Sequence, residues 1–156
     1  MANTVAGPVK DLKFVNSRFQ IELGNGIKTK FITEVSGLSI DVQVADYTQG
    51  SSRALFSGNT PGSTKYGDIT IKRFLTGDGD QDFWKWIKKI RDGGEPERTG
   101  GSIVLYAANM KDEVDRWTFE NAWPSKWALS DLDVSSDAPM TETVTLTIET
   151  LTREKK

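Results

Sequence analysis

Cysteine and histidine are both missing from this chain of 156 residues. Without cysteine there can be no disulfide, no thiolate metal site and no cysteine nucleophile. Without histidine the chain lacks the commonest general base and the commonest metal ligand. A hydrolytic or metal site would have to be built from carboxylates, lysine, serine and tyrosine, which is uncommon. We therefore expect no cofactor.

A surplus of charge and a long apolar run are missing as well. Twenty basic residues stand against 22 acidic ones, which gives a net charge of -2, and no long block of either sign occurs. Nucleic acid is therefore not an expected partner, because general attraction to phosphate needs a basic surface. No apolar run approaches the ~20 residues that cross a bilayer, and the first residues do not resemble a secretion signal. The sequence thus predicts no membrane-spanning segment and assembly in the cytoplasm.

The stretch from Asp68 to Trp86 gives the clearest prediction of secondary structure, a strand followed by a helix. Its first part alternates, with Ile69, Ile71 and Arg73 on one side, as in a half-buried strand. After a glycine-rich break, apolar residues recur at the spacing of an amphipathic helix, namely at Phe83, Trp86, Ile87 and Ile90. This is the only convincing helix in the sequence. We expect it to begin near Asp80, which would cap it, and to end at a glycine cap over residues 92–94.

Alternating patterns elsewhere predict strands. Residues 19–23 and 27–35 flank Gly24-Asn25-Gly26 and predict a hairpin. Residues 40–44 alternate apolar side chains with Asp41 and Gln43, which predicts water or a polar cavity on the charged side. The run 102–107 is apolar enough for burial on both sides, and 143–149 alternates threonine with aliphatic residues. The predicted fold class is mainly β, an antiparallel β-barrel or sandwich with one flanking α-helix.

One domain is expected over residues 14–152, with a flexible N-terminal arm over 1–13 and a short C-terminal tail over 153–156. Residues 48–67 are rich in glycine and small polar residues and are predicted to be a loop. Such a loop is far longer than the usual ~4–6 residues, so it is either a mobile flap or docks on a partner. Docking is favoured, because Leu55 and Phe56 would have little core of their own to enter.

Two motifs in the sequence have simpler explanations than a binding site. Asp78-x-Asp80-x-Asp82 resembles the start of a calcium loop, but Phe83 stands where glycine is needed and Lys89 where a glutamate belongs. Helix capping accounts better for these aspartates. Gly24-x-Gly26 lacks a third glycine and does not open a helix, so it indicates a turn and not a dinucleotide site.

Five tryptophans and 22 acidic residues support an alternative function, a carbohydrate-binding or hydrolytic β domain. Trp86 lies on the apolar helix stripe, and Trp117, Trp123 and Trp127 stand beside other apolar residues, so packing is favoured over sugar stacking. Trp84 lies off the main stripe and indicates a contact surface. Carboxylate pairs at a suitable spacing are expected by chance among so many acids.

Several segments, taken in order, resemble the tail tube family of contractile phages and phage-tail-like contractile injection systems. The matching segments are Phe31-Ile-Thr-Glu-Val-Ser-Gly-Leu38, Tyr47-Thr-Gln-Gly50, Asn59-Thr-Pro-Gly62 with Lys65, Asp68-Ile-Thr-Ile-Lys-Arg-Phe74, Phe83-Trp-Lys-Trp86, Phe119-Glu-Asn-Ala-Trp-Pro-Ser-Lys-Trp127 and the closing strand Glu142 to Leu151. Together they span nearly the whole chain. Lys72-Arg73-Phe74 departs from the Lys-Arg-Gly that the family usually shows.

The resemblance implies a structural protein without enzymatic activity. Six copies would close into a hexameric ring, and rings would stack into a hollow inner tube within a contractile sheath. The implied partners are further copies of the chain, the sheath protein, baseplate, spike and cap proteins, and a cargo effector in the lumen of a particle that is released from the cell. A tube initiator or other baseplate-proximal paralogue, or the tail tube protein of a contractile phage, are the alternatives within the family.

Three groups of residues are candidates for roles in this assembly. The inter-subunit loop group consists of Tyr47, Gly50, Leu55, Phe56, Pro61, Gly62 and Lys65. The structural residues of the family motifs are Lys72, Arg73, Trp86, Trp123, Pro124 and Trp127. The candidates for the lumen face, where polar side chains would keep the channel wet, are Asp41, Gln43, Thr143, Thr145 and Thr147.

Overall fold

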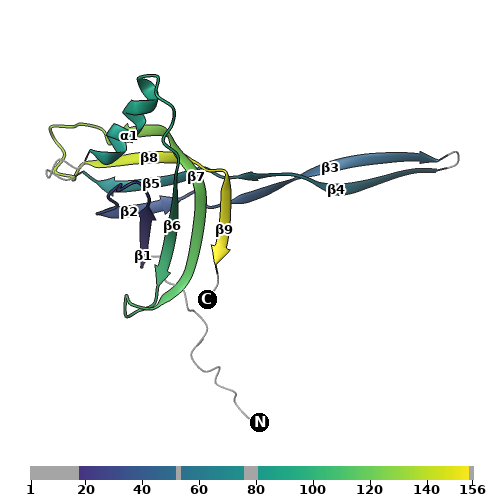
Figure 1. Cartoon of the computed structure of the whole chain (residues 1–156), viewed down its shortest axis with the longest axis horizontal. Helices are drawn as coiled ribbons and strands as arrows, with labels where there is room; N and C mark the ends of the chain where they lie inside the picture. Colours follow the sequence, from purple (N-terminus) through teal and green to yellow (C-terminus); the bar gives the residue numbers. More distant parts are fainter. Residues whose placement is uncertain (1–17, 52–53, 76–80, 155–156) are drawn as a thin grey trace, which may run out of the picture.

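The computed structural model describes residues 18–51, 54–75 and 81–154, and of 49–51 and 54–57 only the backbone. The described part consists of strands and one helix, which confirms the predicted mainly β class with a single helix (Figure 1). The elements are β1 (Phe19–Leu23), β2 (Ile32–Ser36), β3 (Ile40–Ser51), β4 (Ala54–Tyr66), β5 (Ile69–Phe74), α1 (Asp82–Arg91), β6 (Thr99–Tyr106), β7 (Glu113–Leu129), β8 (Thr141–Thr147) and β9 (Thr150–Glu154).

Seven strands form one antiparallel sheet that bends over on itself. Its order is β1-β6-β7-β8-β5-β2, and β9 pairs with β7. The long strand β7 pairs with β6 and β9 along its first half and with β8 along its second half. The bend falls at Asn121, which has a φ of 55° and donates from Nδ2 to Oε2 of Glu149 over 2.8 Å. Asparagine is one of the few residues that adopt this left-handed conformation readily.

The two halves of the bent sheet and the helix enclose one core. The buried apolar residues are Ile21, Ile69, Ile71, Phe83, Trp86, Ile103, Phe119, Ala122, Val144, Leu146 and Ile148. The predicted helix stripe is confirmed, because Phe83 and Trp86 enter this core from α1. The glycine end of the helix is confirmed too: Gly93 has a φ of 87°, and the backbone N–H of Gly94 donates to the carbonyl of Lys89 over 2.9 Å.

The helix begins at Asp82, close to the expected start but with another cap, and the first hairpin was predicted wrongly. The N-cap is Gln81, which makes no side-chain capping bond, and Asp80 lies outside the described residues. Asn25 and Gly26 do form a turn with positive φ, but β1 pairs with β6 and β2 pairs with β5. The turn chemistry was therefore right, yet the segment after it crosses to the other end of the sheet before it pairs.

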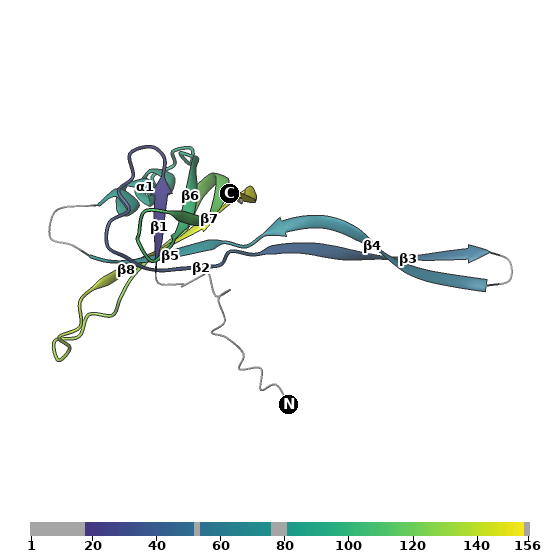
Figure 2. The ribbon, with the colours of Figure 1, turned by 90° about the horizontal axis from the view of Figure 1, so that it is seen from below.

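The segment 48–67, predicted to be a loop, is mostly β structure. β3 and β4 form a separate two-stranded antiparallel sheet, called the β-arm below, in which Gly50 pairs with Leu55 and Gln49 with Phe56. Figures 1 and 2 show the β-arm projecting from the seven-stranded body as a long twisted ribbon. Each strand of a lone ribbon has one unpaired edge, so glycine and Pro61 are tolerated there. A register shift near Pro61 marks a bulge.

Of the predicted N-terminal arm and C-terminal tail, the structure describes two residues only. Arg153 and Glu154, expected in a C-terminal tail, are the last two residues of β9 and pair with Trp117 and Arg116. The pairing continues because β7 offers a free edge beside β8. The predicted N-terminal arm, residues 1–13, and Lys155 and Lys156 lie outside the described residues.

Candidate assembly interface

The β-arm is an outward continuation of the strand pair β2–β5. The antiparallel pairing runs from Ser36 and Thr70 in the body to Ile40 and Tyr66 in the β-arm. Between them lies a neck, residues 37–39 and 67–68, where the N–H of Gly67 donates to the carbonyl of Ser39 over 3.0 Å. The same ribbon therefore belongs to the core at one end and leaves the body at the other.

Two glycines make the neck possible. Gly37 has a φ of 89°, and a Cβ at this position would overlap the carbonyl oxygen of Asp68. A Cβ on Gly67 would overlap the Ser39 side chain and the Gly37 carbonyl. The two backbones approach too closely here for any side chain, so the direction of the β-arm depends on both glycines.

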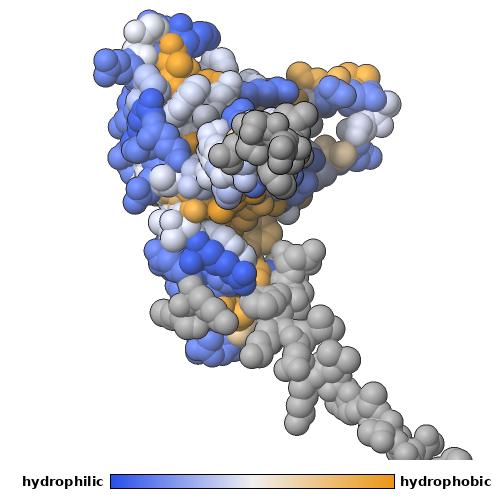
Figure 3. All heavy atoms as spheres, turned by 90° about the vertical axis from the view of Figure 1, so that its right-hand side faces the viewer, coloured by the Kyte–Doolittle hydropathy of each residue, from blue (hydrophilic) through white to orange (hydrophobic). Residues whose placement is uncertain are grey.

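An aliphatic row lies exposed along the first half of β3. The side chains of Ile40, Val42 and Val44 are 53%, 52% and 68% exposed. The apolar side of this strand meets water as well as the charged side, because the ribbon leaves the body and none of the described residues forms a second layer over it. Figure 3, which faces the end of the molecule that carries the β-arm, shows hydrophobic surface beside the grey tip. A lone two-stranded ribbon is marginally stable in water, so this surface needs a cover.

The structure places the predicted inter-subunit residues together on the β-arm. Tyr47 and Gly50 lie on β3, and the others lie on β4. The Tyr47 ring fills the space that a side chain at Gly58 would occupy, and Tyr47 is itself 52% exposed. Lys65 pairs in register with Asp41. What these residues contact in an assembly remains a prediction.

The two candidate lumen rows lie in different sheets. Asp41 and Gln43 are on the β-arm, where Ser63 Oγ donates to Gln43 Oε1 over 3.0 Å. Thr143, Thr145 and Thr147 are half-buried on β8, and alternate with the buried residues of that strand. The hydroxyls of Thr145 and Thr70 are 3.5 Å apart. The threonine row therefore belongs to a polar outer face of the main sheet, which the β-arm residues do not share.

A buried ion pair connects the family-motif residues. Arg73 and Glu142, each 2% exposed, pair through Nε and Oε1 across β5 and β8. The second oxygen of Glu142 accepts a 3.0 Å hydrogen bond from Nε1 of Trp127. The Arg73 guanidinium also lies 4.1 Å from the centre of the Phe83 ring and donates to the carbonyl of Lys28 over 3.1 Å. The sequence did not reveal this role of Glu142, although its spacing from Val144 and Leu146 places it on the buried face of β8.

An apolar cleft lies directly beside this ion pair. Its volume is about 190 Å³, and it is called the Trp84 cleft below. The residues that line it are Leu75, Gln81, Trp84, Trp127, Leu129 and Glu142. The rings of Trp84 and Trp127 lie 4.8 Å apart at 57° to one another. Leu75 and Leu129 are each 40% exposed at its mouth. Trp84, predicted to mark a contact surface, thus lines an exposed apolar cleft, and its contact with another molecule stays a prediction.

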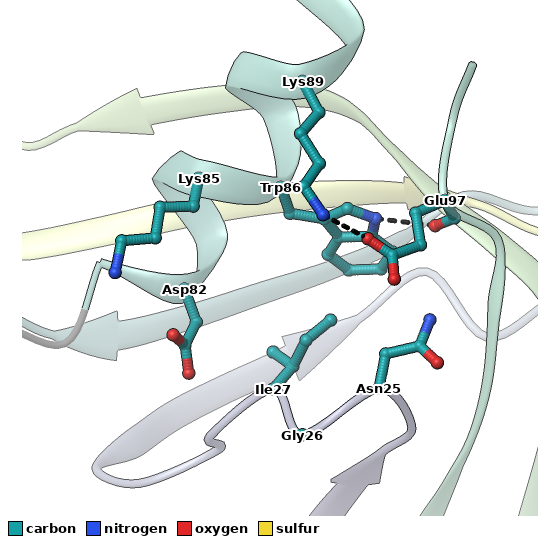
Figure 4. Close-up of a pocket in the computed structure, with 8 residues that line it drawn as sticks. All are labelled: Asn25, Gly26, Ile27, Asp82, Lys85, Trp86, Lys89 and Glu97. Carbon is teal, nitrogen blue, oxygen red and sulfur yellow. Dashed lines mark hydrogen bonds and ion pairs between the residues drawn. The ribbon is translucent and has the colours of Figure 1, made fainter. Parts of the chain in front are cut away.

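The remaining family-motif tryptophans and Pro124 support the body. Trp86 donates from Nε1 to the carbonyl of Glu97 over 2.7 Å beneath a small cavity of about 140 Å³ (Figure 4). Lys89 and Glu97 form an ion pair at its rim. Pro124 is fully buried in β7, next to Trp123. Within residues 18–51, 54–75 and 81–154 no cluster of acidic residues could hold a metal ion.

The β7–β8 loop presents a second exposed apolar surface. Leu132 is 77% exposed and Val134 is 109% exposed. Asp133 accepts hydrogen bonds at Oδ1 from the hydroxyl (2.7 Å) and the backbone N–H (2.9 Å) of Ser135, and these bonds lower the pKa of its carboxyl group. A hydrogen-bonded turn therefore holds Val134 outward.

Two arginines on the first half of β7 and on β9 pair with carboxylates. Hydrogen bonds to Glu113 raise the pKa of the Arg116 side chain, and hydrogen bonds to Asp115 raise the pKa of the Arg153 side chain.

No helix among the described residues is long and apolar enough to cross a membrane. The sequence pattern of the family described as T4-like virus tail tube protein gp19 matches residues 15–152. No curated protein matches the sequence.

Solved structures share the fold at low sequence identity. A chain of the anti-feeding prophage cap, the AFP tube terminating cap, is similar with a TM-score of 0.82 and 22% identity over 100% of both chains. A chain of the PVC sheath-tube complex, an extracellular contractile injection system in its extended state, has a TM-score of 0.80 and 20% identity over 94% of this chain and 95% of that one. Hcp1 from Flavobacterium johnsoniae has a TM-score of 0.57 and 20% identity over 89% and 96%.

Proposed function

The chain belongs to the T4-like virus tail tube protein family, and from this membership we propose that it is the inner tube subunit of a phage-tail-like contractile injection system. The family is structural, so the chain is a structural protein and not an enzyme. In the proposed assembly, six copies close into a ring and rings stack into a hollow conduit. The mechanism is passive: the tube carries cargo, and a contractile sheath supplies the work.

The observation that carries the proposal is the exposed β-arm. A two-stranded ribbon with an uncovered aliphatic row is unfavourable in an isolated molecule, and further copies of the chain are the simplest cover. β1 and β2 end the strand order of the main sheet within the described residues, and their outer edges provide further pairing surfaces. Interfaces between unlike patches of identical subunits close into rings or extend into filaments, and a tube needs both kinds.

The polar outer face of the main sheet is the proposed lumen wall. Thr143, Thr145 and Thr147 lie on this face with Thr70 and Lys72 of the neighbouring strand. Short hydroxyl side chains keep such a wall wet without offering cargo an apolar surface. Asp41 and Gln43 belong to the β-arm, so their part in the lumen depends on where the β-arm of a neighbouring copy lies.

The proposed partners follow from the family and from the similar structures. They are the sheath protein, baseplate and spike proteins, the cap and a cargo effector in the lumen. The titles of similar structures include a sheath-tube complex, a tube terminating cap and a baseplate. We propose assembly in the cytoplasm, within a particle that acts outside the producing cell. No metal or other cofactor is part of this proposal.

A single-ring paralogue at the end of the tube is the second candidate. The similarity to a tube terminating cap, at a TM-score of 0.82, and to a baseplate chain, at 0.75, favours it, because these proteins share the fold. Ring stacking separates the two candidates. A main tube protein forms long stacks, whereas an initiator or terminator stops at one ring.

Electron microscopy of the purified chain tests the proposal, with the chain expressed alone and together with sheath and baseplate proteins. We expect hexameric rings, and tubes at high concentration or with the baseplate present. Isolated rings under all conditions would favour the single-ring paralogue. A protein that stays monomeric in both preparations would overturn both candidates.

A further inference from the structure

We infer that the Trp84 cleft is the receptor for the β-arm of another copy, in the adjacent ring of the proposed tube. This inference rests on the proposed function and adds the contact that joins one ring to the next. It assigns the aliphatic row of β3 to a single binding site, the Trp84 cleft of another copy. It also assigns a role to Trp84, Leu75 and Leu129, which the buried ion pair leaves unexplained.

On the β-arm, the proposed contact surface is the aliphatic row followed by a carboxylate, that of Asp46. Side chains of alternate residues share one face of a strand, so Ile40, Val42, Val44 and Asp46 point the same way. Val44 is the most exposed of the three aliphatic residues, at 68%. The opposite face carries Asp41, Gln43, Ala45 and Tyr47 and is polar near the neck. Among the described side chains of β3, the three larger aliphatic groups therefore share the first face, which suits an apolar cleft.

The surface at the cleft complements this row, because an apolar region lies next to a cationic one. Trp84 and Trp127 form its walls, and Leu75 and Leu129 stand at its mouth. Residues spaced by four and seven share a helix face with Trp84, which places Lys88 and Arg91 next to the cleft. The Arg91 guanidinium lies 5.5 Å from the centre of the Trp84 ring, and its Nε also pairs with Oδ1 of the exposed Asp92 over 2.9 Å. An aliphatic side chain followed by a carboxylate fits this surface, with Val44 in the cleft and Asp46 beside Arg91.

The cleft is prepared in advance by the buried ion pair. Glu142 fixes the Trp127 indole through the 3.0 Å bond to Nε1, and Arg73 holds Glu142. A rigid wall reduces the side-chain entropy that is lost when a partner binds. A volume of about 190 Å³ is enough for one or two aliphatic side chains.

The two surfaces lie at opposite ends of one chain. Figures 1 and 2 show the β-arm leaving one end of the body, while the β7–β8 loop, which begins next to Leu129, lies at the other end. One copy therefore cannot bring its own β-arm to its own cleft, and each copy offers one of each surface. That arrangement is a heterologous contact, which propagates from copy to copy.

Contact with the adjacent ring follows from the direction of the strands. The β-arm continues β2 and β5, which belong to the proposed lumen wall. Strands of a closed barrel tilt by roughly 35–45° from its axis and so run more along the axis than around it. A strand of 12 residues such as β3 extends roughly 40 Å in that direction, which takes the β-arm out of its own ring.

Cysteine cross-linking tests the inference without background, because the natural chain has no cysteine. The double variant Val44→Cys/Leu129→Cys is treated with a short bismaleimide after tubes have formed. We expect a covalent ladder that continues beyond six subunits, since each link joins one ring to the next. The matched control is Ala45→Cys/Leu129→Cys, with the cysteine on the opposite face of β3, and it should give little or no ladder.

Two outcomes of this experiment overturn the inference while leaving the proposed function intact. One is tubes that form normally without a ladder. The other is a ladder that stops at six, because the contact would then lie within a ring. Absence of rings and tubes in the unsubstituted protein is a separate result and would overturn the proposed function itself.

A charge exchange gives an independent test if the cysteine variants do not assemble. Asp46→Arg and Arg91→Asp should each raise the protein concentration needed for tubes by about tenfold or more, since each leaves like charges facing one another. Rings should still form. The double variant Asp46→Arg/Arg91→Asp should restore tubes, and failure to restore them with intact rings would contradict the pairing.

Discussion

Trp127 donates its indole N–H to the carboxylate of Glu142 over 3.0 Å, inside a protein where Glu142 is only 2% exposed. This bond connects the buried charge network to the wall of the Trp84 cleft. It joins strand β7, in the segment that resembles the tail tube family, to strand β8. Stability of the body and the shape of an assembly surface therefore depend on the same carboxylate.

Removing that carboxylate should destabilise the whole body. Glu142→Gln keeps the shape but removes the carboxylate charge that pairs with the buried Arg73 guanidinium, and breaking a buried ion pair costs about 3–5 kcal/mol. The matched control is Glu149→Gln, which breaks an exposed pair with Arg98 and should cost no more than about 1 kcal/mol. Thermal melting at equal protein concentration measures both. Equal melting temperatures for the two variants would contradict the role given to Glu142.

A side chain at Gly37 should misdirect the β-arm. Gly37→Ala adds both the cost of a left-handed φ, about 1–2 kcal/mol, and an overlap with the Asp68 carbonyl. Gly93→Ala is the control, because Gly93 has nearly the same φ, 87°, with nothing within 4 Å of an added Cβ. Both variants should lower the melting temperature, but only Gly37→Ala should reduce tube formation. Normal tubes from Gly37→Ala would show that the neck can rearrange.

The two faces of the β-arm should differ in their importance for assembly. Val44→Asp places a charge in the aliphatic row, whereas Ala45→Asp places one on the adjacent, opposite face. Val44 is 68% exposed, so the unassembled protein should change in stability by less than about 0.5 kcal/mol. Val44→Asp should abolish tubes, and Ala45→Asp should leave them largely intact. Sedimentation and electron microscopy measure the difference, and equal loss in both variants would argue against a one-sided contact.

The lumen assignment predicts a size-dependent reactivity at Thr145. Thr145→Cys is the only thiol in the variant chain, so its labelling can be read directly. A small maleimide should react at similar rates in unassembled protein and in tubes, because the lumen is open to solvent. A bulky polymer-linked maleimide should react with the unassembled protein but far more slowly with tubes. Equal labelling of tubes by the bulky reagent would place the threonine row on the outside.

The turn at Asp133 should depend on pH. Hydrogen bonds from Ser135 lower the pKa of the Asp133 carboxyl in the folded loop, so their contribution is present above the ordinary aspartate pKa and is lost as the pH falls through the lowered value. A carboxyl NMR titration of an unassembled preparation measures it. Ser135→Ala should return the pKa toward its ordinary range, and Ser136→Ala, which keeps both bonds to Asp133, should not. An unchanged pKa in Ser135→Ala would contradict the assignment.

The sequence by itself determined the class of the fold, the helix and the family. Alternation over residues 69–73 and 143–149 and the stripe from Phe83 to Ile90 depend on periods of two and of 3.6, which are local properties of the chain. The glycine at the end of α1 could be predicted for the same reason, since φ at one residue decides it. Local rules also gave the turn at Asn25 and Gly26 correctly.

Only the tertiary structure decided which strands pair and which faces are covered. β1 pairs with β6 and not with β2, because pairing depends on the whole sheet and not on the nearest turn. Glu142 lies on the inward face of β8 with Val144 and Leu146, and its charge is tolerated there because Arg73, far away in the sequence, pairs with it. Val44 is exposed because the ribbon carries it away from the body. Composition alone made residues 48–67 look like a loop. Backbone hydrogen bonds between two edge strands, which need no particular side chains, make most of that segment a ribbon.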